Sequence, residues 1–378
     1  MDTTPALPLA HYRLLGNTGL RVSPLCLGTM TFGKEWGFGA EKDESRRIFE
    51  EYAQAGGNFV DTAINYNLGT SEEWCGEFLA SERERFVLAT KYSFSTREGD
   101  PNSGGNHRKN MVQSVEASLR RMKTDYIDLY WLHVWEFRTP VEEVMRAVDD
   151  LVRAGKILYF GLSDTPAWKV AQAHTLSTLR GWTGITAIQI EYSLIERTVE
   201  RELMPMAREL GLGVTPWSPL GAGVLTGKYL DNPEGEGDGT RAKAAARRFN
   251  ERNTSIAKTV REVAVEAGCS SAQAALAWLL KQPGVTSPII GARTVQQLRD
   301  NLGCLSVELG EAHLARLSDV SAIEPGFPNH FIYNPNIQTA ICAKTVWCIS
   351  ATLAFASDIA GRVSTIKTTK NRVVFRET

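Results

Sequence analysis

Four side chains of different chemistry follow three consecutive strand-like runs of the sequence. Asp61 lies at the end of one run with Tyr66 five residues later, Lys91 directly follows the next run, and His133 ends the third. A free tyrosine has a pKa of about 10, and a lysine ammonium beside it would stabilise its phenolate and make it a better acid. The aspartate would pair with the ammonium, and the imidazole could donate a hydrogen bond to a carbonyl oxygen. The set predicts a site that polarises and protonates a carbonyl group.

Such a site has neither a nucleophile nor a source of electrons. The sequence contains no G-x-S-x-G motif and no cysteine in a reactive setting. Its six cysteines lie far apart without C-x-x-C or Cys/His spacing, so we expect neither a metal site nor a disulfide framework. A site that only polarises and protonates a carbonyl needs an external electron donor, and a nicotinamide hydride fits that need.

The elements that must position these residues alternate between short apolar runs and helical patterns. The runs mostly lack polar alternation, as in parallel strands buried on both faces. There are eight of them: Leu25–Gly28, Phe59–Ala63, Phe86–Thr90, Tyr126–His133, Tyr159–Ser163, Ile185–Glu191, Gly213–Ser218 and Thr286–Gly291. Segments with helical period, such as Asp43–Gly56 and Val141–Gly155, separate them and end in glycine.

A strand–helix unit about every 30 residues predicts an α/β fold, a (β/α)8 TIM barrel. In such a barrel the carboxyl ends of the strands face the active site, which is where the four residues stand. The alternative is an open, doubly wound sheet of the Rossmann type. That fold typically has a G-x-G-x-x-G motif after the first strand, and Gly28–Gly33 does not match this motif.

Parts of the chain stand outside the repeat. Tyr12–Val22 places turn residues between two apolar flanks and predicts a β-hairpin that caps the amino-terminal end of the barrel. Leu220–Asn250 is a long insertion after the seventh strand, first acidic and then basic over Arg241–Arg248. We therefore expect a flexible N-terminus at 1–11, a barrel at 12–328 and a C-terminal extension at 329–378.

The tail does not continue the pattern. Ala340–Ala356 is an apolar stretch of 17 residues interrupted by Lys344, at the lower limit for a membrane span. Three interpretations stay open. The one we favour is a poorly ordered extension or an altered reading frame; the others are a helix packed on the barrel and an amphipathic or tail-anchor contact with a membrane.

Composition limits the partners. The chain has 378 residues with 42 Lys+Arg and 43 Asp+Glu, and a net charge of −1 argues against a nucleic-acid partner. Hydrophobic residues at 43% and charged residues at 22% are typical of a globular protein. Met1–His11 lacks an apolar core and is not a signal peptide, so we expect a cytoplasmic protein. The oligomeric state is not indicated.

Seven motifs in order resemble the aldo-keto reductase family, in its microbial aryl-alcohol-dehydrogenase-like type. They cover roughly residues 12–328 and are FVDTAINYNLGTSE (Phe59–Glu72), LATK (Leu88–Lys91), DLYWLH (Asp128–His133), GLSD (Gly161–Asp164), QIEYS (Gln189–Ser193), PWSPLGAGVLTGKY (Pro216–Tyr229) and PIIGARTVQQLRDNL (Pro288–Leu302). The resemblance implies a barrel that binds NADP(H) without a Rossmann domain. It also implies a catalytic tetrad of Asp61, Tyr66, Lys91 and His133, with Tyr66 as general acid/base.

The resemblance also implies cofactor contacts. Ser163, Asp164 and Gln189 would bind the nicotinamide carboxamide, although the family often has asparagine where this chain has Asp164. Trp217 would stack on the nicotinamide ring, and Arg293 would meet the 2′-phosphate and favour NADPH. The remaining implied contacts are Asp61, then Ser218, Pro219, Leu220, Gly221, Ala222, Gly223, Val224, Leu225, Thr226, Gly227 and Lys228 over the pyrophosphate, and Gln297 and Asn301 on one helix face with Arg293. His133 and Trp135 would contact the substrate.

Two functions follow from this pattern. The first is reduction of small-molecule aldehydes or ketones to alcohols by NADPH, with the substrate set by loops that the sequence does not explain. The alternative is a regulatory subunit that resembles potassium-channel beta subunits, which bind NADPH in the same barrel and act on a partner. Steady-state NADPH oxidation separates the two.

Overall fold

The computed structural model describes residues 8–230 and 247–341. The chain divides into two compact units, residues 1–323 and 324–378. The first unit holds every described strand, and the second holds two short described helices, α12 (Asn329–Ile332) and α13 (Pro335–Ile341). The interpretations of the apolar tail concern residues that lie almost wholly outside the described ones.

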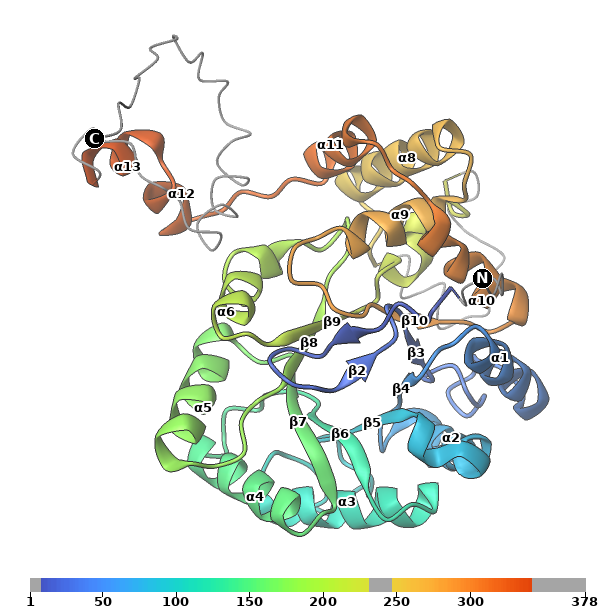
Figure 1. Cartoon of the computed structure of the whole chain (residues 1–378), viewed down its shortest axis with the longest axis vertical. Helices are drawn as coiled ribbons and strands as arrows, with labels where there is room; N and C mark the ends of the chain where they lie inside the picture. Colours follow the sequence, from blue (N-terminus) through green and yellow to red (C-terminus); the bar gives the residue numbers. More distant parts are fainter. Residues whose placement is uncertain (1–7, 231–246, 342–378) are drawn as a thin grey trace, which may run out of the picture. The chain divides into compact units, whose positions relative to one another are not determined.

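Eight parallel strands form the barrel of the first unit (Figure 1). A parallel bridge between Val214 and Val285 links the last strand to the segment before the first in the order. That order is β10 (Ile289–Gly291), β3 (Cys26–Gly28), β4 (Phe59–Asp61), β5 (Val87–Tyr92), β6 (Ile127–Leu132), β7 (Ile157–Ser163), β8 (Ala187–Glu191) and β9 (Gly213–Trp217). The predicted (β/α)8 barrel is confirmed, because β3 to β8 each pair with the next strand in sequence and β10 returns to pair with β3.

The pleat of the strands decides which side chains enter the barrel, since successive residues point to opposite faces. The register pairs Asp61 with Ala89 and Lys91 with Trp131, so residues of one face align from strand to strand. The interior apolar cluster takes alternate residues of the barrel strands, namely Cys26 of β3 and the odd-numbered Phe59, Val87, Ala89, Leu129, Trp131, Ala187 and Ile289. Asp61, Lys91 and Gln189 continue the same alternation at the carboxyl ends.

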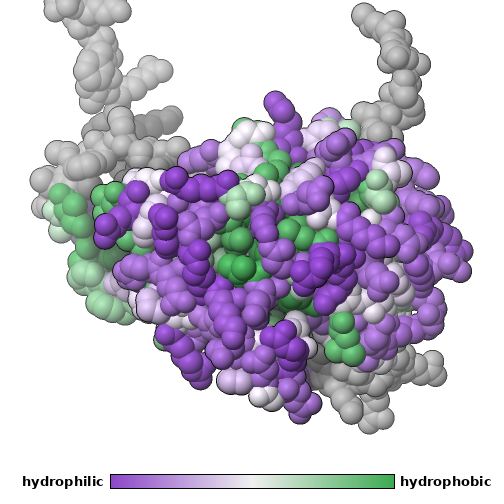
Figure 2. All heavy atoms as spheres, turned by 90° about the horizontal axis from the view of Figure 1, so that it is seen from below, coloured by the Kyte–Doolittle hydropathy of each residue, from purple (hydrophilic) through white to green (hydrophobic). Residues whose placement is uncertain are grey.

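Helices surround the strands on the outside (Figure 1). They are α1 (Lys42–Gln54), α2 (Thr70–Leu79), α3 (Arg108–Met122), α4 (Val141–Arg153), α5 (Ala167–Arg180), α6 (Leu203–Glu209), α8 (Glu251–Glu266), α9 (Ser271–Leu280), α10 (Val295–Gly303) and α11 (Glu311–Val320), with short 3-10 turns η1 (Tyr66–Gly69), η2 (Ala80–Arg85), η3 (Thr198–Glu200), η4 (Gly221–Thr226) and η5 (Cys304–Ser306). In α4 the buried residues Val144, Val148 and Leu151 recur at helical spacing. The outer faces are polar, and the side of the molecule in Figure 2 is mostly hydrophilic.

The predicted hairpin closes one end of the barrel. β1 (Arg13–Leu14) and β2 (Arg21–Val22) pair antiparallel, and the fully buried Leu15 and Val22 join the interior cluster. Arg13 donates two hydrogen bonds to the backbone carbonyls of residues 285 and 286, at 3.2 and 3.1 Å. These carbonyls precede β10, so the hairpin lies at the amino ends of the strands, opposite the four candidate residues.

The long insertion after β9 is described only in part. η4 follows β9 directly, and α8 begins at Glu251. Residues 231–246, with the acidic stretch and most of the basic run, lie outside the described residues. Among the described helices, none is long and apolar enough to cross a membrane alone; α8 and α9 reach that length and composition only as a pair bent by 96°.

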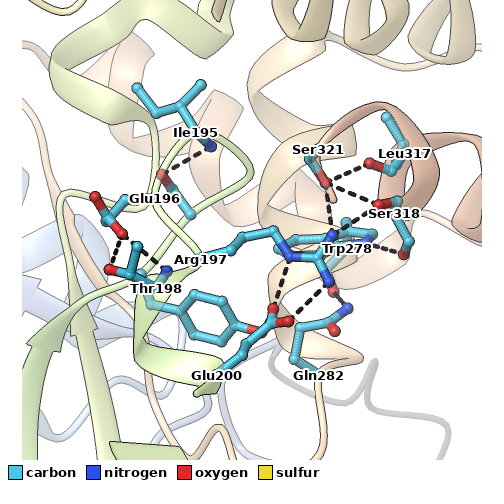
Figure 3. A network of polar contacts seen from close by, with 12 residues as sticks. Ile195, Glu196, Arg197, Thr198, Glu200, Trp278, Gln282, Leu317, Ser318 and Ser321 are labelled. Carbon is cyan, nitrogen blue, oxygen red and sulfur yellow. Dashed lines mark hydrogen bonds and ion pairs between the residues drawn. The ribbon is translucent and has the colours of Figure 1, made fainter. Parts of the chain in front are cut away.

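A buried polar network fastens the loop after β8 to α9 and α11 (Figure 3). Arg197 donates to both carboxylate oxygens of Glu200, at 2.7 and 2.9 Å, and to Ser318 O and Ser321 Oγ. Its guanidinium lies 5.2 Å from the ring centroid of Trp278, whose indole N–H donates to Ser318 Oγ at 2.9 Å. Because this loop continues from the carboxyl end of β8, the network holds that strand end in place.

Candidate active site

The carboxyl ends of β4, β5 and β6 bring the predicted tetrad together. Asp61 ends β4, Lys91 lies one residue before the end of β5, and His133 directly follows β6. Tyr66 begins η1, a few residues after β4. Asp61 and Lys91 are buried, whereas Tyr66 and His133 are half-buried. The charged pair is thus shielded from water, and the phenol and imidazole are the accessible members.

Lys91 is the centre of the group. Its Nζ forms an ion pair with Asp61 Oδ2 and donates to Thr62 O at 2.8 Å and to Tyr66 OH at 3.1 Å. These three contacts use the three donors of an ammonium group. The same nitrogen lies 4.7 Å from the centroid of the Tyr66 ring, so the cation faces the phenol closely.

The charges of this pair follow from their surroundings. Burial raises the pKa of Asp61, although Lys91 and Gln189 act in the opposite direction. Burial lowers the pKa of Lys91, but Asp61 and Tyr66 together outweigh it, and the net shift is upward. A raised lysine pKa keeps the ammonium charged at neutral pH, so Asp61 has a permanent partner.

The pKa of Tyr66 is raised above its ordinary value. Burial of the phenol is the largest cause, and it outweighs Lys91, which lowers the pKa. The effect of Lys91 has the predicted direction, and the net pKa still lies above the ordinary value because burial disfavours the phenolate more strongly. Tyr66 therefore holds its proton throughout the neutral range.

His133 is a neutral imidazole at neutral pH. Burial, and after it the charge of Lys91, lowers its pKa well below the ordinary value. The neutral ring has one N–H to donate. Its centroid lies 5.9 Å from that of Tyr66, edge to face, and no described residue bonds its buried Nδ1.

The chain turns sharply after Tyr66. Asn67, Leu68 and Gly69 have φ values of 44°, 55° and 103°, in the left-handed region. That region costs about 1–2 kcal/mol for a residue with a Cβ, so the segment needs support. The side chain of Asn67 is fully buried and donates to two backbone carbonyls of the loop after β3, each at 3.0 Å. Its Oδ1 accepts a hydrogen bond from the backbone N–H of Trp36. No pattern in the sequence around Asn67 predicts this support.

The ends of β7 and β8 place the residues predicted for the carboxamide. Gln189 Nε2 donates to Asp61 Oδ1 at 3.0 Å, and Ser163 is buried at the end of β7. Asp164 accepts from the indole N–H of Trp217 at 3.0 Å. Desolvation raises the pKa of Asp164 to about 6; the Trp217 hydrogen bond opposes this shift, and the Glu191 carboxylate adds to it.

The turn after β9 carries the glycines that the sequence predicts over the pyrophosphate. Ala222, Gly223 and Gly227 are left-handed, with φ values of 56°, 97° and 78°. A Cβ on Gly223 would lie 3.3 Å from Lys228 Cε, so the lysine side chain lies against this turn. Gly221 has a φ of 57°, in the left-handed region that favours glycine, and a Cβ there would approach Ile195 Cδ1 to 2.4 Å. The turn thus brings an exposed ammonium to a glycine-rich backbone.

One detail of the predicted adenosine side differs. The sequence placed Arg293, Gln297 and Asn301 on one helix face, but α10 begins at Val295 and Arg293 lies before it. The reason is Thr294, which caps the helix by accepting from the Gln297 N–H at 3.2 Å. Gln297 in turn accepts from the Arg293 N–H at 2.9 Å, and Asn301 is buried.

The structure adds an ion pair that sequence reasoning missed. Glu191 ends β8 on the inner face and pairs with Arg248, from the segment before α8. The sequence places Arg248 in a basic run and Glu191 in the QIEYS motif, and neither pattern predicts an ion pair between them. The two are 57 positions apart, so no local signal could have joined them.

Aromatic side chains surround the accessible members of the tetrad. Trp36 contacts Tyr66 edge-on with ring centroids 5.9 Å apart, and Phe94 contacts His133 at 4.6 Å. Trp135, predicted to contact substrate, is 5% exposed and has Lys169 Nζ 5.4 Å from its ring. Trp36 and Phe94 were missed because long loops carry them.

Within residues 8–230 and 247–341, no group of three or more His, Cys, Asp or Glu side chains could hold a metal ion.

Comparison with known proteins agrees with this geometry. A family model described as "Aldo/keto reductase family" matches residues 24–322. Norsolorinic acid reductase stcV of Emericella nidulans is 39% identical over 360 residues, covering 92% of this chain and 91% of that protein. Aldo-keto reductase ausK of the same organism is 36% identical over 338 residues, covering 86% and 85%. A Saccharomyces cerevisiae protein named "Putative aryl-alcohol dehydrogenase AAD14" is 34% identical over 366 residues, covering 93% and 97%.

Proposed function

The chain belongs to the aldo/keto reductase family, and from this membership we propose that it reduces a small-molecule aldehyde or ketone to the alcohol with NADPH. The observation that carries the proposal is the contact of Tyr66 OH with Lys91 Nζ at 3.1 Å, beside a neutral His133. A protonated phenol, a fixed cation and a neutral imidazole suit transfer of one proton to a carbonyl oxygen.

Each member of the tetrad has a separate part in the proposed reaction. Tyr66 holds the proton at its OH and releases it to the substrate oxygen. Lys91 stabilises the phenolate that remains, because its ammonium already touches the phenol oxygen. His133 orients the carbonyl with its N–H, and Asp61 compensates the buried charge of Lys91. The nicotinamide would supply the hydride.

The residues expected to hold the cofactor fit a dinucleotide. Lys228 lies against the left-handed Gly223, which places an exposed ammonium beside a glycine-rich turn, a combination that suits phosphate. The indole of Trp217 is oriented through its hydrogen bond to Asp164, so the ring has a fixed plane on which to stack. Arg293, before the capped start of α10, is proposed to bind the 2′-phosphate and favour NADPH.

We propose further that the substrate is an aromatic carbonyl compound. Trp36 and Phe94 contact Tyr66 and His133, so a carbonyl carbon near these groups would meet aromatic edges on two sides. The names of two relatives, a norsolorinic acid reductase and an aryl-alcohol dehydrogenase, support the same class.

A matched pair of substrates tests the proposal. Benzaldehyde and cyclohexanecarbaldehyde have the same carbon skeleton, and only the first is aromatic. With NADPH we expect turnover of benzaldehyde and a clearly lower kcat/KM for the saturated analogue; NADH in place of NADPH should raise the KM for cofactor. Tight NADPH binding without turnover of any carbonyl in a wider panel would contradict the reductase proposal and favour a regulatory binding protein.

A further inference from the structure

A buried carboxylate lies on the outer face of β5, outside the tetrad. Glu72, in the first turn of α2, has a fully buried side chain. It accepts hydrogen bonds from Thr90 Oγ1 at 2.6 Å and Ser118 Oγ at 2.7 Å, and it forms an ion pair with Arg121. Thr90 directly precedes Lys91, so this carboxylate joins α2, β5 and α3 behind the catalytic lysine.

Arg121 connects this carboxylate to the segment that carries Tyr66. Its Nη1 donates to the backbone carbonyl of Ile64 at 3.1 Å. Its guanidinium also lies against Gly69, where a Cβ would approach Arg121 Cζ to 2.7 Å. Ile64 and Gly69 stand on either side of Tyr66, so one guanidinium contacts the segment at both ends.

This segment needs external support. The three residues after Tyr66 are left-handed, two of them with a Cβ, and such a backbone persists only where its surroundings hold it. The side chain of Asn67 holds it against the loop after β3. Arg121 holds it against α3, and Glu72 fixes Arg121 in turn.

We propose that Glu72 and Arg121 are positioning residues for carbonyl reduction. The pair holds residues 64–69 so that Tyr66 OH stays at hydrogen-bond distance from Lys91 Nζ. This inference rests on the proposed function of Tyr66 as proton donor. A misplacement of about 1 Å at a reacting group can lower the rate 100-fold. Contacts that fix the position of residues 64–69 therefore affect turnover directly.

A second ion pair provides a matched control. Arg83 pairs with Asp128 at 2.7 Å, with side chains 15% and 11% exposed. Arg83 also donates to the backbone carbonyls of Phe86 and Tyr126, at 3.2 and 2.9 Å. This pair joins η2 to the amino ends of β5 and β6, away from Tyr66.

The experiment compares Arg121→Ala with Arg83→Ala in the full-length chain. For Arg121→Ala we expect kcat to fall roughly 10- to 100-fold with NADPH affinity unchanged. Guanidinium ion at millimolar concentration should restore part of the loss, and amide hydrogen exchange should become faster in residues 64–69. Arg83→Ala should lower the melting temperature and leave kcat and the exchange of that segment unchanged.

Wild-type kcat and exchange in Arg121→Ala would overturn the inference, and so would an equal loss of kcat in Arg83→Ala. If Arg121→Ala does not fold, the double variant Glu72→Gln/Arg121→Met leaves no buried charge unpaired and carries the same expectations for kcat and amide exchange, without rescue by guanidinium ion. A wild-type protein without turnover of any carbonyl contradicts the proposed function instead, and the exchange of residues 64–69 still decides the inference.

Discussion

Gln189 Nε2 donates a hydrogen bond to Asp61 Oδ1 at 3.0 Å and so joins β8 to β4 across the interior of the barrel. The two strands are not neighbours in the sheet. Asp61 therefore has one oxygen on Lys91 and the other on Gln189. The Asp61 carboxylate therefore links the tetrad, through Lys91, to Gln189, which is expected to bind the cofactor. A substitution of Asp61 should disturb both.

Replacing Lys91 by methionine should destabilise the fold in a pH-dependent way. Asp61 would remain buried without its cation, at a cost of about 3–5 kcal/mol of unfolding free energy at neutral pH. Burial already raises the pKa of Asp61, and loss of Lys91 raises it further. The folded variant then binds a proton that the unfolded chain has lost, so its stability falls as pH rises from the ordinary aspartate pKa through the raised one.

Urea unfolding of Lys91→Met in mildly acidic and in neutral buffer checks this expectation. The loss of unfolding free energy relative to wild type should be smaller in the acidic buffer. The double variant Asp61→Asn/Lys91→Met is the control, because it leaves no charge and should recover much of the loss. A deficit that is independent of pH would contradict the account of the pair.

Replacing Tyr66 by phenylalanine should remove reduction and leave cofactor binding intact. Only the phenol oxygen is lost, and general acid catalysis contributes about 10²- to 10⁴-fold to rate. Tyr130→Phe is the control: this buried tyrosine faces away from the interior, and no described residue bonds its OH. Turnover retained in Tyr66→Phe, measured by NADPH oxidation, would refute the proposed proton donor.

Asp164 should make NADPH binding depend on pH. Its pKa is raised to about 6, so it is a hydrogen-bond donor below that pH and an anion that only accepts above it. Since the cofactor is itself anionic, we expect affinity to weaken as pH rises through about 6. Fluorescence titration of NADPH over this range should show the transition in wild type and a flat response in Asp164→Asn.

A second variant tests one contribution to that shift, whose largest cause is burial of Asp164. Glu191 raises the pKa of Asp164, so Glu191→Gln should move the transition to lower pH without removing it. A transition that persists in Asp164→Asn would assign the pH dependence to another group.

Replacing Arg197 by methionine should destabilise the barrel. Arg197 and Glu200 are 11% and 8% exposed, and removal of one partner from a buried pair costs about 3–5 kcal/mol of unfolding free energy. Arg299→Met is the control, because Arg299 pairs with Glu51 through two bonds at 2.8 and 3.0 Å but is 58% exposed. Exposed pairs contribute about 1 kcal/mol or less. If urea unfolding shows equal losses of unfolding free energy in Arg197→Met and Arg299→Met, the distinction between the buried and the exposed pair is wrong.

The strands were predictable because burial on both faces leaves a run of apolar residues with few exceptions. The ends of the helices were less predictable. For example, α10 starts two residues after Arg293, because the side chain of Thr294 caps the helix by accepting a hydrogen bond from the Gln297 N–H. The long loops gave no signal for Trp36 and Phe94, because a loop has no periodicity to extrapolate. Their contacts with Tyr66 and His133 depend on how the barrel closes.

The sequence by itself determined that Asp61, Lys91 and His133 lie at the carboxyl ends of consecutive strands and share a face, because the two-residue period of a strand is a local property. Only the tertiary structure decided the net pKa of Tyr66, since it depends on how much water the packed chain removes relative to the charge of Lys91. It also decided the pairings Gln189–Asp61, Arg248–Glu191 and Arg121–Glu72. Each joins residues that are far apart in the chain, and only the closed barrel brings them within reach.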